Sequence, residues 1–210
     1  MFDIHTHILP GVDDGAESLE EALSMLRTLK SRGFNGVFLT PHLNHPTVKT
    51  NKEFILHTFE DLRTELEKQQ LQVYLGSELY LSPNYEEPIP LGDTDLVLVE
   101  LPTNVYPQYL EETIFDLQLS GHRVILAHVE RYRWLTENIP LIEKLRDRNV
   151  LFQVNLRALV AKHERAIWFK KHNLIDFVST DCHGLDDLKV LDHGLVHYRE
   201  LIKRSEEFLF

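Results

Sequence analysis

Side chains that bind metal ions follow most of the short apolar segments of this sequence, at the point where each segment ends. These positions are occupied by His5-Thr6-His7, Thr40-Pro41-His42, Gly76-Ser77-Glu78, Val99-Glu100, Ala127-His128 and Ser179-Thr180-Asp181-Cys182-His183. If the segments are parallel strands, their carboxyl ends meet at one rim, where α/β folds place their active sites. The sequence therefore predicts that these histidines and carboxylates converge on one metal site.

Two of the segments carry paired candidate ligands. Side chains alternate along a strand, so His5 and His7 share one face, as do Asp181 and His183. The whole set mixes imidazole with carboxylate and contains no cluster of thiolates. That composition suits Mn, Fe or Zn better than Ca or a cysteine-rich structural zinc site.

An ordinary structural explanation exists for several of these residues. Asp14 could be a turn residue before Gly15, and a lone Glu78 or Glu100 could cap the next helix. Histidines away from the strand ends are interpreted as surface or hydrogen-bonded residues: His45, His57, His122, His163, His172, His193 and His197. The shared position at strand ends favours metal binding by the remaining group: His5, His7, His42, Glu78, His128, Asp181 and His183.

Cys182 lies inside this group, but its surroundings do not fit a cysteine phosphatase. Such an enzyme needs an arginine six residues after the cysteine, where this chain has Leu188, and the intervening Asp186 and Asp187 would repel phosphate. We therefore predict that Cys182 is a small buried residue. The sequence also contains no Gly-x-x-x-x-Gly-Lys phosphate loop, Gly-x-Ser-x-Gly elbow or dinucleotide fingerprint.

Seven apolar segments, mostly separated by helical patterns, must position these groups. The expected strands are residues 2–5, 36–40, 71–75, 96–99, 123–127, 151–154 and 177–180, and the expected helices are 19–33, 55–66, 108–121, 141–148, 166–172 and 188–203. The strands are apolar almost continuously, which is typical of a parallel sheet covered by helices on both faces. A closed barrel and an open doubly wound sheet both fit this pattern.

Composition limits the class of protein. The chain has 210 residues, 43% hydrophobic and 26% charged, with no linker, so we expect one domain over residues 1–210. The excess of 33 acidic over 22 basic residues gives a net charge of −11, which argues against binding to nucleic acid or anionic membranes. No apolar stretch is long enough to insert in a membrane, the N-terminus does not fit a signal peptide, and a single cysteine favours the cytoplasm.

The same segments resemble, in order, the bacterial PHP-superfamily tyrosine phosphatases of the CpsB/YwqE type. The resemblance rests on DIHTHILPGVDDG (residues 3–15), TPH (40–42), GSELY (76–80), AHVERY (127–132) and STDCH (179–183), and extends over nearly the whole chain. It implies a distorted (β/α)7 barrel, the PHP fold, that holds three metal ions, commonly manganese. It also implies hydrolysis of phosphotyrosine on the bacterial tyrosine kinases that regulate capsule and exopolysaccharide assembly.

The resemblance also implies a role for each residue. A first metal ion would take His5, His7, Glu78 and Asp181; a second would take Glu78 as a bridge, Glu100 and His128; a third would take Asp14, His42 and His183. Arg131 would hold a phosphate oxygen and, with Asp14 and Glu100, forms the expected catalytic group. The chain departs from the family in residues 184–187, which lack an expected arginine near the substrate, and in a shorter C-terminus. Arg133 or Arg157 could replace that arginine.

Charge supports a phosphate substrate for such a site. Three divalent ions would bring +6 and the four carboxylates −4, which leaves +2 for a phosphate dianion. Ions about 3.5–4 Å apart lower the pKa of a water between them, so we expect direct attack of metal-bridging hydroxide on phosphorus with no covalent intermediate. Tyr80, Tyr106, Tyr132 and the segment Pro83 to Pro90 either line the rim and stack on the substrate ring or are ordinary half-buried residues.

Other functions use the same residues. A small-molecule phosphatase, such as a histidinol-phosphate phosphatase, keeps the fold and the metal ions but changes the substrate. A PHP nuclease is disfavoured by the charge of −11 and the lack of a basic groove. A noncatalytic protein that binds the phosphotyrosine tail of a kinase would have no use for Arg131 beside open metal positions.

Overall fold

The strands of the protein form two sheets in which every pair is parallel. In the computed structural model, which describes residues 1–209, the smaller sheet has the order β1 (Phe2–Asp3), β2 (Gly36–Leu39), β4 (Gln72–Leu75). The larger sheet has the order β3 (His42–Leu43), β5 (Glu78–Tyr80), β6 (Leu96–Glu100), β7 (Arg123–Leu126), β8 (Leu151–Asn155), β9 (Phe177–Ser179). All seven expected strands are present. Phe210, the last residue of the expected domain, lies outside the described residues.

Two expected strands continue beyond a break and join the second sheet. Strand β2 ends before Thr40-Pro41, after which the chain forms β3 in the larger sheet. Strand β4 likewise ends before Gly76-Ser77, after which the chain forms β5 in the larger sheet. A proline has no N–H to donate to a ladder, and Gly76 passes so close to Leu91 that an added Cβ would lie 2.6 Å from its Cδ2. These breaks were not predicted. They carry His42 and Glu78 onto the larger sheet.

Residues 5–7 close the curl of the sheets. The N–H of Asp181 donates to the carbonyl oxygen of His5 (3.0 Å), and the N–H of His7 donates to that of Cys182 (3.0 Å). On the other side, the N–H of Thr40 donates to the carbonyl oxygen of Thr6 (2.8 Å). The segment after β1 therefore lies between the ends of β9 and β2. The expected distorted α/β barrel is confirmed, and the open doubly wound sheet is excluded.

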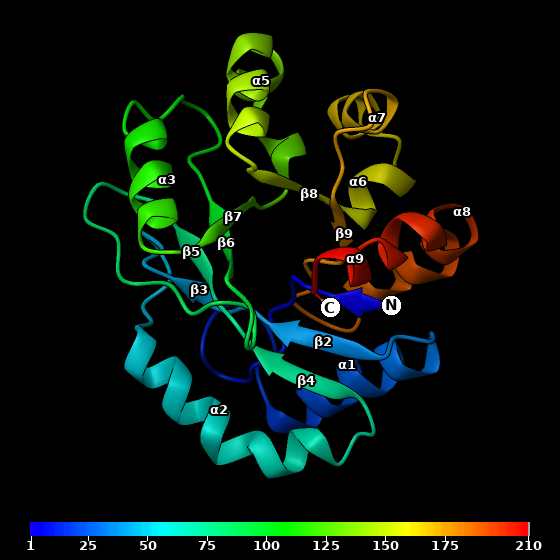
Figure 1. The fold of residues 1–210 in the computed structure, drawn as a ribbon. Helices are drawn as coiled ribbons and strands as arrows, with labels where there is room; N and C mark the ends of the chain where they lie inside the picture. The colour runs from blue at the N-terminus through cyan, green and yellow to red at the C-terminus, as the bar shows by residue number, and fades with distance from the viewer. Residues whose placement is uncertain (210) are drawn as a thin grey trace.

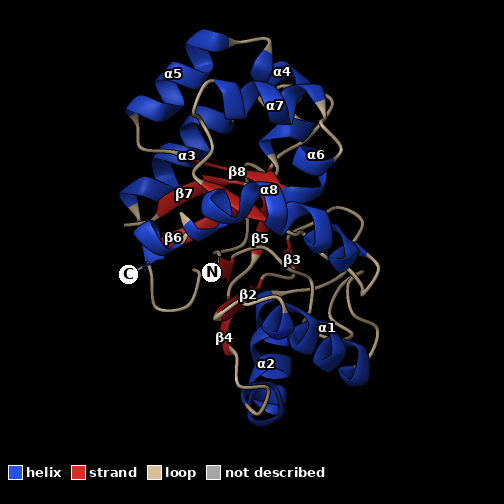
Figure 2. Cartoon of the chain, turned by 90° about the vertical axis from the view of Figure 1, so that its right-hand side faces the viewer, coloured by secondary structure: helices blue, strands red, loops and turns tan. Residues whose placement is uncertain are grey.

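Helices form an outer layer around the strands (Figure 1). Those expected from the sequence are α1 (Leu19–Ser31), α2 (Lys52–Glu67), α3 (Leu110–Leu119), α5 (Ile139–Asp147), α7 (Glu164–Lys171) and α8 (Leu191–Lys203). Short ones that were not expected are η1 (Val129–Arg131), α4 (Arg133–Thr136), α6 (Leu156–Val160) and α9 (Glu206–Leu209), and the expected helix 188–203 begins as the separate short helix η2 (Asp187–Val190). In Figure 2, α1 and α2 lie below the strands, α4 to α7 lie above them, and α8 lies in front of them.

The start of α1 illustrates how the sequence sets these elements. The hydroxyl of Ser18 accepts a hydrogen bond from the N–H of Glu21 (3.3 Å), as the expected helix start requires. Its buried face, with Ala22, Met25 and Leu26, packs into one apolar core that extends through most of the chain. None of the helices within residues 1–209 combines the length and apolar character needed to cross a bilayer.

Candidate metal centre

The predicted ligands converge at one end of the strands. Most of them follow β1, β7 and β9 or end β6, whereas His42 and Glu78 are the first residues of β3 and β5. Three overlapping groups place candidate ligand atoms within 4.8 Å of one another: His7, Asp14, His42 and His183; His5, Glu78 and His128; His5, His7 and Asp181. Glu100 falls in a fourth group with His42 and His45. Its Oε1 also lies 3.7 Å from Nε2 of His128, the neighbour that the family resemblance implies.

Glu78 occupies the centre of these groups. Its Oε1 accepts from Nε2 of His128 (2.8 Å) and lies 3.2 Å from Nε2 of His5. Its Oε2 lies 2.9 Å from Nδ1 of His42 and 3.4 Å from Nε2 of His7. The side chain is almost fully buried. A carboxylate with different imidazoles at its two oxygens has the arrangement of a bridging ligand.

Three buried polar atoms of the centre form no hydrogen bond of good geometry within the described part of the chain: His42 Nδ1, Glu78 Oε2 and Glu100 Oε2, the first two only 2.9 Å apart. Leaving one such atom unsatisfied costs about 1–3 kcal/mol, so a native protein supplies a partner. Nδ1 of His42 is 3.8 Å from Oε2 of Glu100 as well as close to Glu78, so the three atoms face one another. Nitrogen and oxygen donors of this kind fit divalent transition-metal ions.

The carboxylates differ in pKa because their neighbours differ. Burial raises the pKa of Glu78, but the imidazoles of His5, His128 and His42 outweigh burial and hold it well below its usual range. Burial raises the pKa of Glu100 to about 8, and the negative charge of Glu78 adds to this shift. Two neighbouring buried carboxylates resist being charged together unless a cation lies between them. The pair therefore favours cation binding.

Asp13 orients two of the candidate ligands, a role that the sequence analysis did not assign. Its buried Oδ2 lies 2.7 Å from Nδ1 of His7 and accepts from the N–H of His42 (3.0 Å). Burial raises the pKa of Asp13, but the hydrogen bond and charge of His7 outweigh it and bring the value to about 2. Because Nδ1 of His7 faces this carboxylate, Nε2 is left toward the centre, as in carboxylate–histidine–metal arrangements.

Two polar residues of β8 form a further support under the centre. Oε1 of Gln153 accepts from the N–H of His128 (2.6 Å) and lies 3.3 Å from Nδ1 of His5. Its Nε2 donates to Oδ1 of Asn155 (2.8 Å), whose Nδ2 donates to Oδ2 of Asp181 (2.7 Å). The sequence signal for this series of hydrogen bonds is Gln153, a polar residue in the otherwise apolar expected strand 151–154.

Arg131 reaches the edge of the centre from η1. Its Nη2 donates to Oδ2 of Asp181, and the side chain is 43% exposed. The expected position beside the cluster is thus occupied, with an open side for a substrate. The rim position suggested for Tyr132 is wrong, because η1 turns the chain and buries Tyr132 completely, with its Oη accepting from the N–H of Leu101 (3.0 Å).

His45 belongs to the centre although it was set aside from the sequence. Asn44 has a φ of 61°, and its Nδ2 donates to the carbonyl oxygen of Tyr80 (2.9 Å), which turns the loop back over the site. Nε2 of His45 then lies 3.7 Å from the unpartnered Oε2 of Glu100. Nδ1 lies 3.4 Å from the backbone nitrogen of Thr47 and 3.1 Å from its Oγ1, so Nδ1 faces the loop and Nε2 faces Glu100. His45 therefore lies in contact with Glu100, too far for a hydrogen bond, where its ring limits the positions open to that carboxylate.

Replacing His45 with Ala is expected to weaken metal binding about 10- to 100-fold, because Glu100 loses the neighbour that orients it. Metal titration followed by calorimetry measures this change directly. His57→Ala is the control, since His57 is 74% exposed on α2. Unchanged metal affinity in the His45 variant would remove this role.

Cys182 is the buried residue that the sequence predicts. The thiol is free and fully buried, and burial raises its pKa, so it is a poor nucleophile. We expect Cys182→Ala to keep its kcat and the wild-type enzyme to resist iodoacetamide. Loss of turnover in a variant that still melts cooperatively and binds metal would show a direct role for the thiol.

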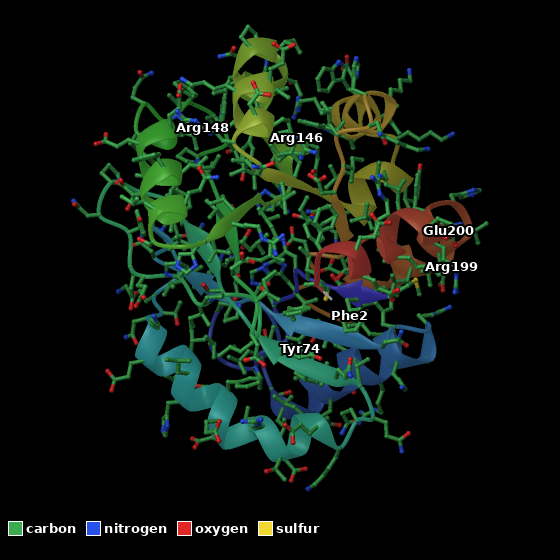
Figure 3. All side chains as sticks on the ribbon, viewed as in Figure 1. Phe2, Tyr74, Arg146, Arg148, Arg199 and Glu200 are labelled. Carbon is green, nitrogen blue, oxygen red and sulfur yellow. The ribbon has the colours of Figure 1, made fainter. Side chains whose placement is uncertain are left out.

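One large cavity lies away from the metal centre. It has a volume of about 990 Å³ and follows the outer edge of the small sheet, where Figure 3 labels two of its lining residues, Phe2 and Tyr74. It contains none of the predicted ligands. A smaller cavity of about 280 Å³ is lined by Arg131, Asp181 and His183 among others. The chemistry of the side chains, rather than cavity size, locates the candidate site.

Fold and site together define a class: α/β-barrel proteins with a cluster of buried histidines and carboxylates, suited to metal ions, at one rim of the strands. Within it, the chain belongs to the CpsB/CapC family of capsular polysaccharide synthesis proteins, whose family profile matches residues 1–189. The resemblance seen in the sequence is thereby confirmed.

Individual relatives agree with this assignment. The chain is 30% identical over 198 residues to the tyrosine-protein phosphatase YwqE of Bacillus subtilis, covering 88% of this chain and 78% of YwqE. It is 28% identical over 204 residues to the tyrosine-protein phosphatase CpsB of Streptococcus agalactiae, covering 89% and 84%. It also matches a chain from the crystal structures of YwqE from B. subtilis and CpsB from Streptococcus pneumoniae, described as metal-dependent tyrosine phosphatases. That match has a TM-score of 0.81 and 28% identity, and covers 95% of this chain and 87% of the other.

Proposed function

We propose that this protein is a metal-dependent tyrosine-protein phosphatase. The observation that carries the proposal is the convergence of buried histidines and carboxylates around Glu78, with three polar atoms that form no hydrogen bond of good geometry among residues 1–209. The names of its relatives point to the same activity. The proposed ligands of three divalent ions, with Mn first and Fe or Zn as alternatives, are His5, His7, Asp14, His42, Glu78, Glu100, His128, Asp181 and His183.

When bound, the ions would lower the pKa of a water molecule and neutralise the charge of a phosphoryl group. The residues of the chain do the rest. Arg131 is placed to donate to phosphoryl oxygens through its exposed guanidinium, while Asn155 keeps Asp181 in position from the buried side. Asp14, 60% exposed, lies 3.5 Å from both His42 and His183 at the open side of the centre.

Phosphotyrosine suits such a site because its phenolate is a good leaving group. A phenol has a pKa of about 10, so its phenolate departs with little need for a proton donor. The buried thiol of Cys182 offers no nucleophile for a covalent intermediate. We therefore propose direct hydrolysis by water. The physiological substrate in this proposal is the phosphotyrosine of a bacterial tyrosine kinase of capsule or exopolysaccharide synthesis, dephosphorylated in the cytoplasm.

Steady-state hydrolysis tests this proposal. The metal-stripped protein is assayed alone and after adding Mn, Fe or Zn, on phosphotyrosine peptides, phosphoserine peptides and histidinol phosphate. We expect metal-dependent turnover concentrated on phosphotyrosine. Turnover mainly on histidinol phosphate would move the substrate to small molecules, and no turnover with any metal would favour a noncatalytic phosphotyrosine-binding role.

A further inference from the structure

A cavity of about 280 Å³ beside the metal centre has two arginines in its wall. Its lining combines Arg131 and Arg157 with the candidate ligands Asp181 and His183, and with Asn155, Thr180 and Asp187. The cavity is therefore continuous with the side chains that hold the proposed metal ions. Each guanidinium group pairs with an aspartate of the same lining, Arg131 with Asp181 and Arg157 with Asp187, so an anionic occupant binds here by replacing one of these partners.

Arg157 is held at the mouth of this cavity by a single aspartate. It follows β8 on the short helix α6, and its Nη2 donates to Oδ1 of Asp187, at the start of η2. The other oxygen of Asp187 accepts from the N–H of His183 (2.8 Å). This second bond ties Asp187 to the metal centre whether or not Arg157 is bound to it.

The contact between Arg157 and Asp187 can be exchanged for another. The side chain of Arg157 is 60% exposed and that of Asp187 is 25% exposed, so water screens the pair and it is weak. An incoming anion can take the guanidinium of Arg157 without disturbing the fold, because Asp187 keeps its bond to the backbone of His183.

Arg133 provides the contrast. It is also exposed, at 77%, but it pairs with Glu137, which directly follows its own short helix, and it lines a different cavity, with Glu164 and Trp168. The sequence alone leaves Arg133 and Arg157 as equal candidates for a second arginine near the substrate. Among these two, only Arg157 shares a cavity with Arg131 and Asp181.

We propose that this cavity binds a second anionic group of the substrate, a carboxylate or phosphoryl group next to the phosphotyrosine, and that Arg157 recognises it. The inference rests on the proposed function. Arg131 contacts the candidate ligand Asp181 itself, so it is the arginine for the reacting phosphoryl group. Arg157 is linked to the centre through Asp187, one side chain further out, which suits a neighbouring group.

The test compares wild type with Arg157→Ala, Arg157→Lys and Arg133→Ala, all loaded with the same metal. The substrates are phenyl phosphate, a phosphotyrosine peptide with Gln neighbours, and the same peptide with Glu or phosphoserine neighbours. For Arg157→Ala, we expect kcat/KM on the acidic peptides to fall about fivefold at low salt, with less effect at high salt. Phenyl phosphate and the Gln peptide should be unaffected, Arg157→Lys should keep part of the preference, and Arg133→Ala should match wild type.

Two outcomes would overturn the inference: an equal loss on all substrates, which would place Arg157 at the reacting phosphoryl group or in the fold, or no loss on any. The Glu and phosphoserine peptides separate a carboxylate from a phosphoryl occupant. If wild type turns over no phosphotyrosine substrate, the proposed function fails instead. Fluorescence anisotropy of the same labelled peptides then still reports whether Arg157→Ala weakens binding of the acidic ones.

Discussion

Glu78→Gln is expected to lower kcat by about 10³-fold or more, because the metal ions on which turnover depends are no longer held at the centre. The two oxygens of Glu78 face four imidazoles, two on each side, and no other carboxylate of the described chain has this position. A glutamine keeps the shape of the side chain but removes its negative charge. It also replaces one carboxylate oxygen with an amide NH₂ group, which cannot bind a metal ion. No neighbouring side chain can substitute, since Asp181 already serves His5 and His7.

Thermal unfolding gives a readout of this variant that does not depend on turnover. A metal ion at 100 times its dissociation constant stabilises the folded state by about 2.7 kcal/mol, which raises the Tm of a chain of this size by about 5–10 °C. Wild type should show this rise when Mn, Fe or Zn is added, and Glu78→Gln should show little of it. Metal content after gel filtration should fall in parallel.

Glu60→Gln is the matched control, since Glu60 is 72% exposed on α2 and pairs with Arg63 of the same helix. It should load metal and melt like wild type. If Glu78→Gln bound metal with wild-type affinity, the bridging role of Glu78 would be refuted, and with it the assignment of the ligands around it.

The sequence was sufficient to place the candidate ligands because their position has a topological cause. Most of the apolar runs are fully buried strands, with the half-exposed β4 as an exception, and the candidate ligands follow them within a few residues at the common rim. That logic located His5, His42, Glu78, His128 and Asp181 without any knowledge of distances, and they converge in the structure. Closure of the barrel did not follow from the pattern. It depends on backbone hydrogen bonds of residues 5–7 to both neighbouring segments, which apolar periodicity does not encode.

The supporting residues were harder to predict because their roles depend on tertiary geometry. Asp13 and Asp14 are adjacent in the sequence, yet Asp13 is buried against His7 and Asp14 is exposed at the open side. His45 reaches Glu100 only because Asn44 adopts a left-handed conformation that is fixed by the chain after β5. Spacing along the chain carries no signal for either arrangement.

Arg131→Ala is expected to lower kcat by about 10²–10³-fold while the metal ions stay bound, the range seen when one donor to a developing anion is removed. The separation of the two effects follows from the contacts of Asp181. When Arg131 is lost, Oδ2 of Asp181 still accepts from Asn155 (2.7 Å), and Oδ1 still lies 3.3 Å from His5 and 3.4 Å from His7. The ligand therefore keeps its position without the arginine.

The measurement pairs kcat and KM on phosphotyrosine peptides with metal content and Tm for wild type, Arg131→Ala, Arg131→Lys and the exposed control Arg133→Ala. Lysine keeps the charge but not the forked geometry, so Arg131→Lys should recover only part of the rate. Loss of metal in proportion to the loss of rate would show that Arg131 acts by holding Asp181 rather than the phosphoryl group. Unchanged turnover with full metal loading would remove Arg131 from the reaction and leave the metal centre to stabilise the phosphoryl charge on its own.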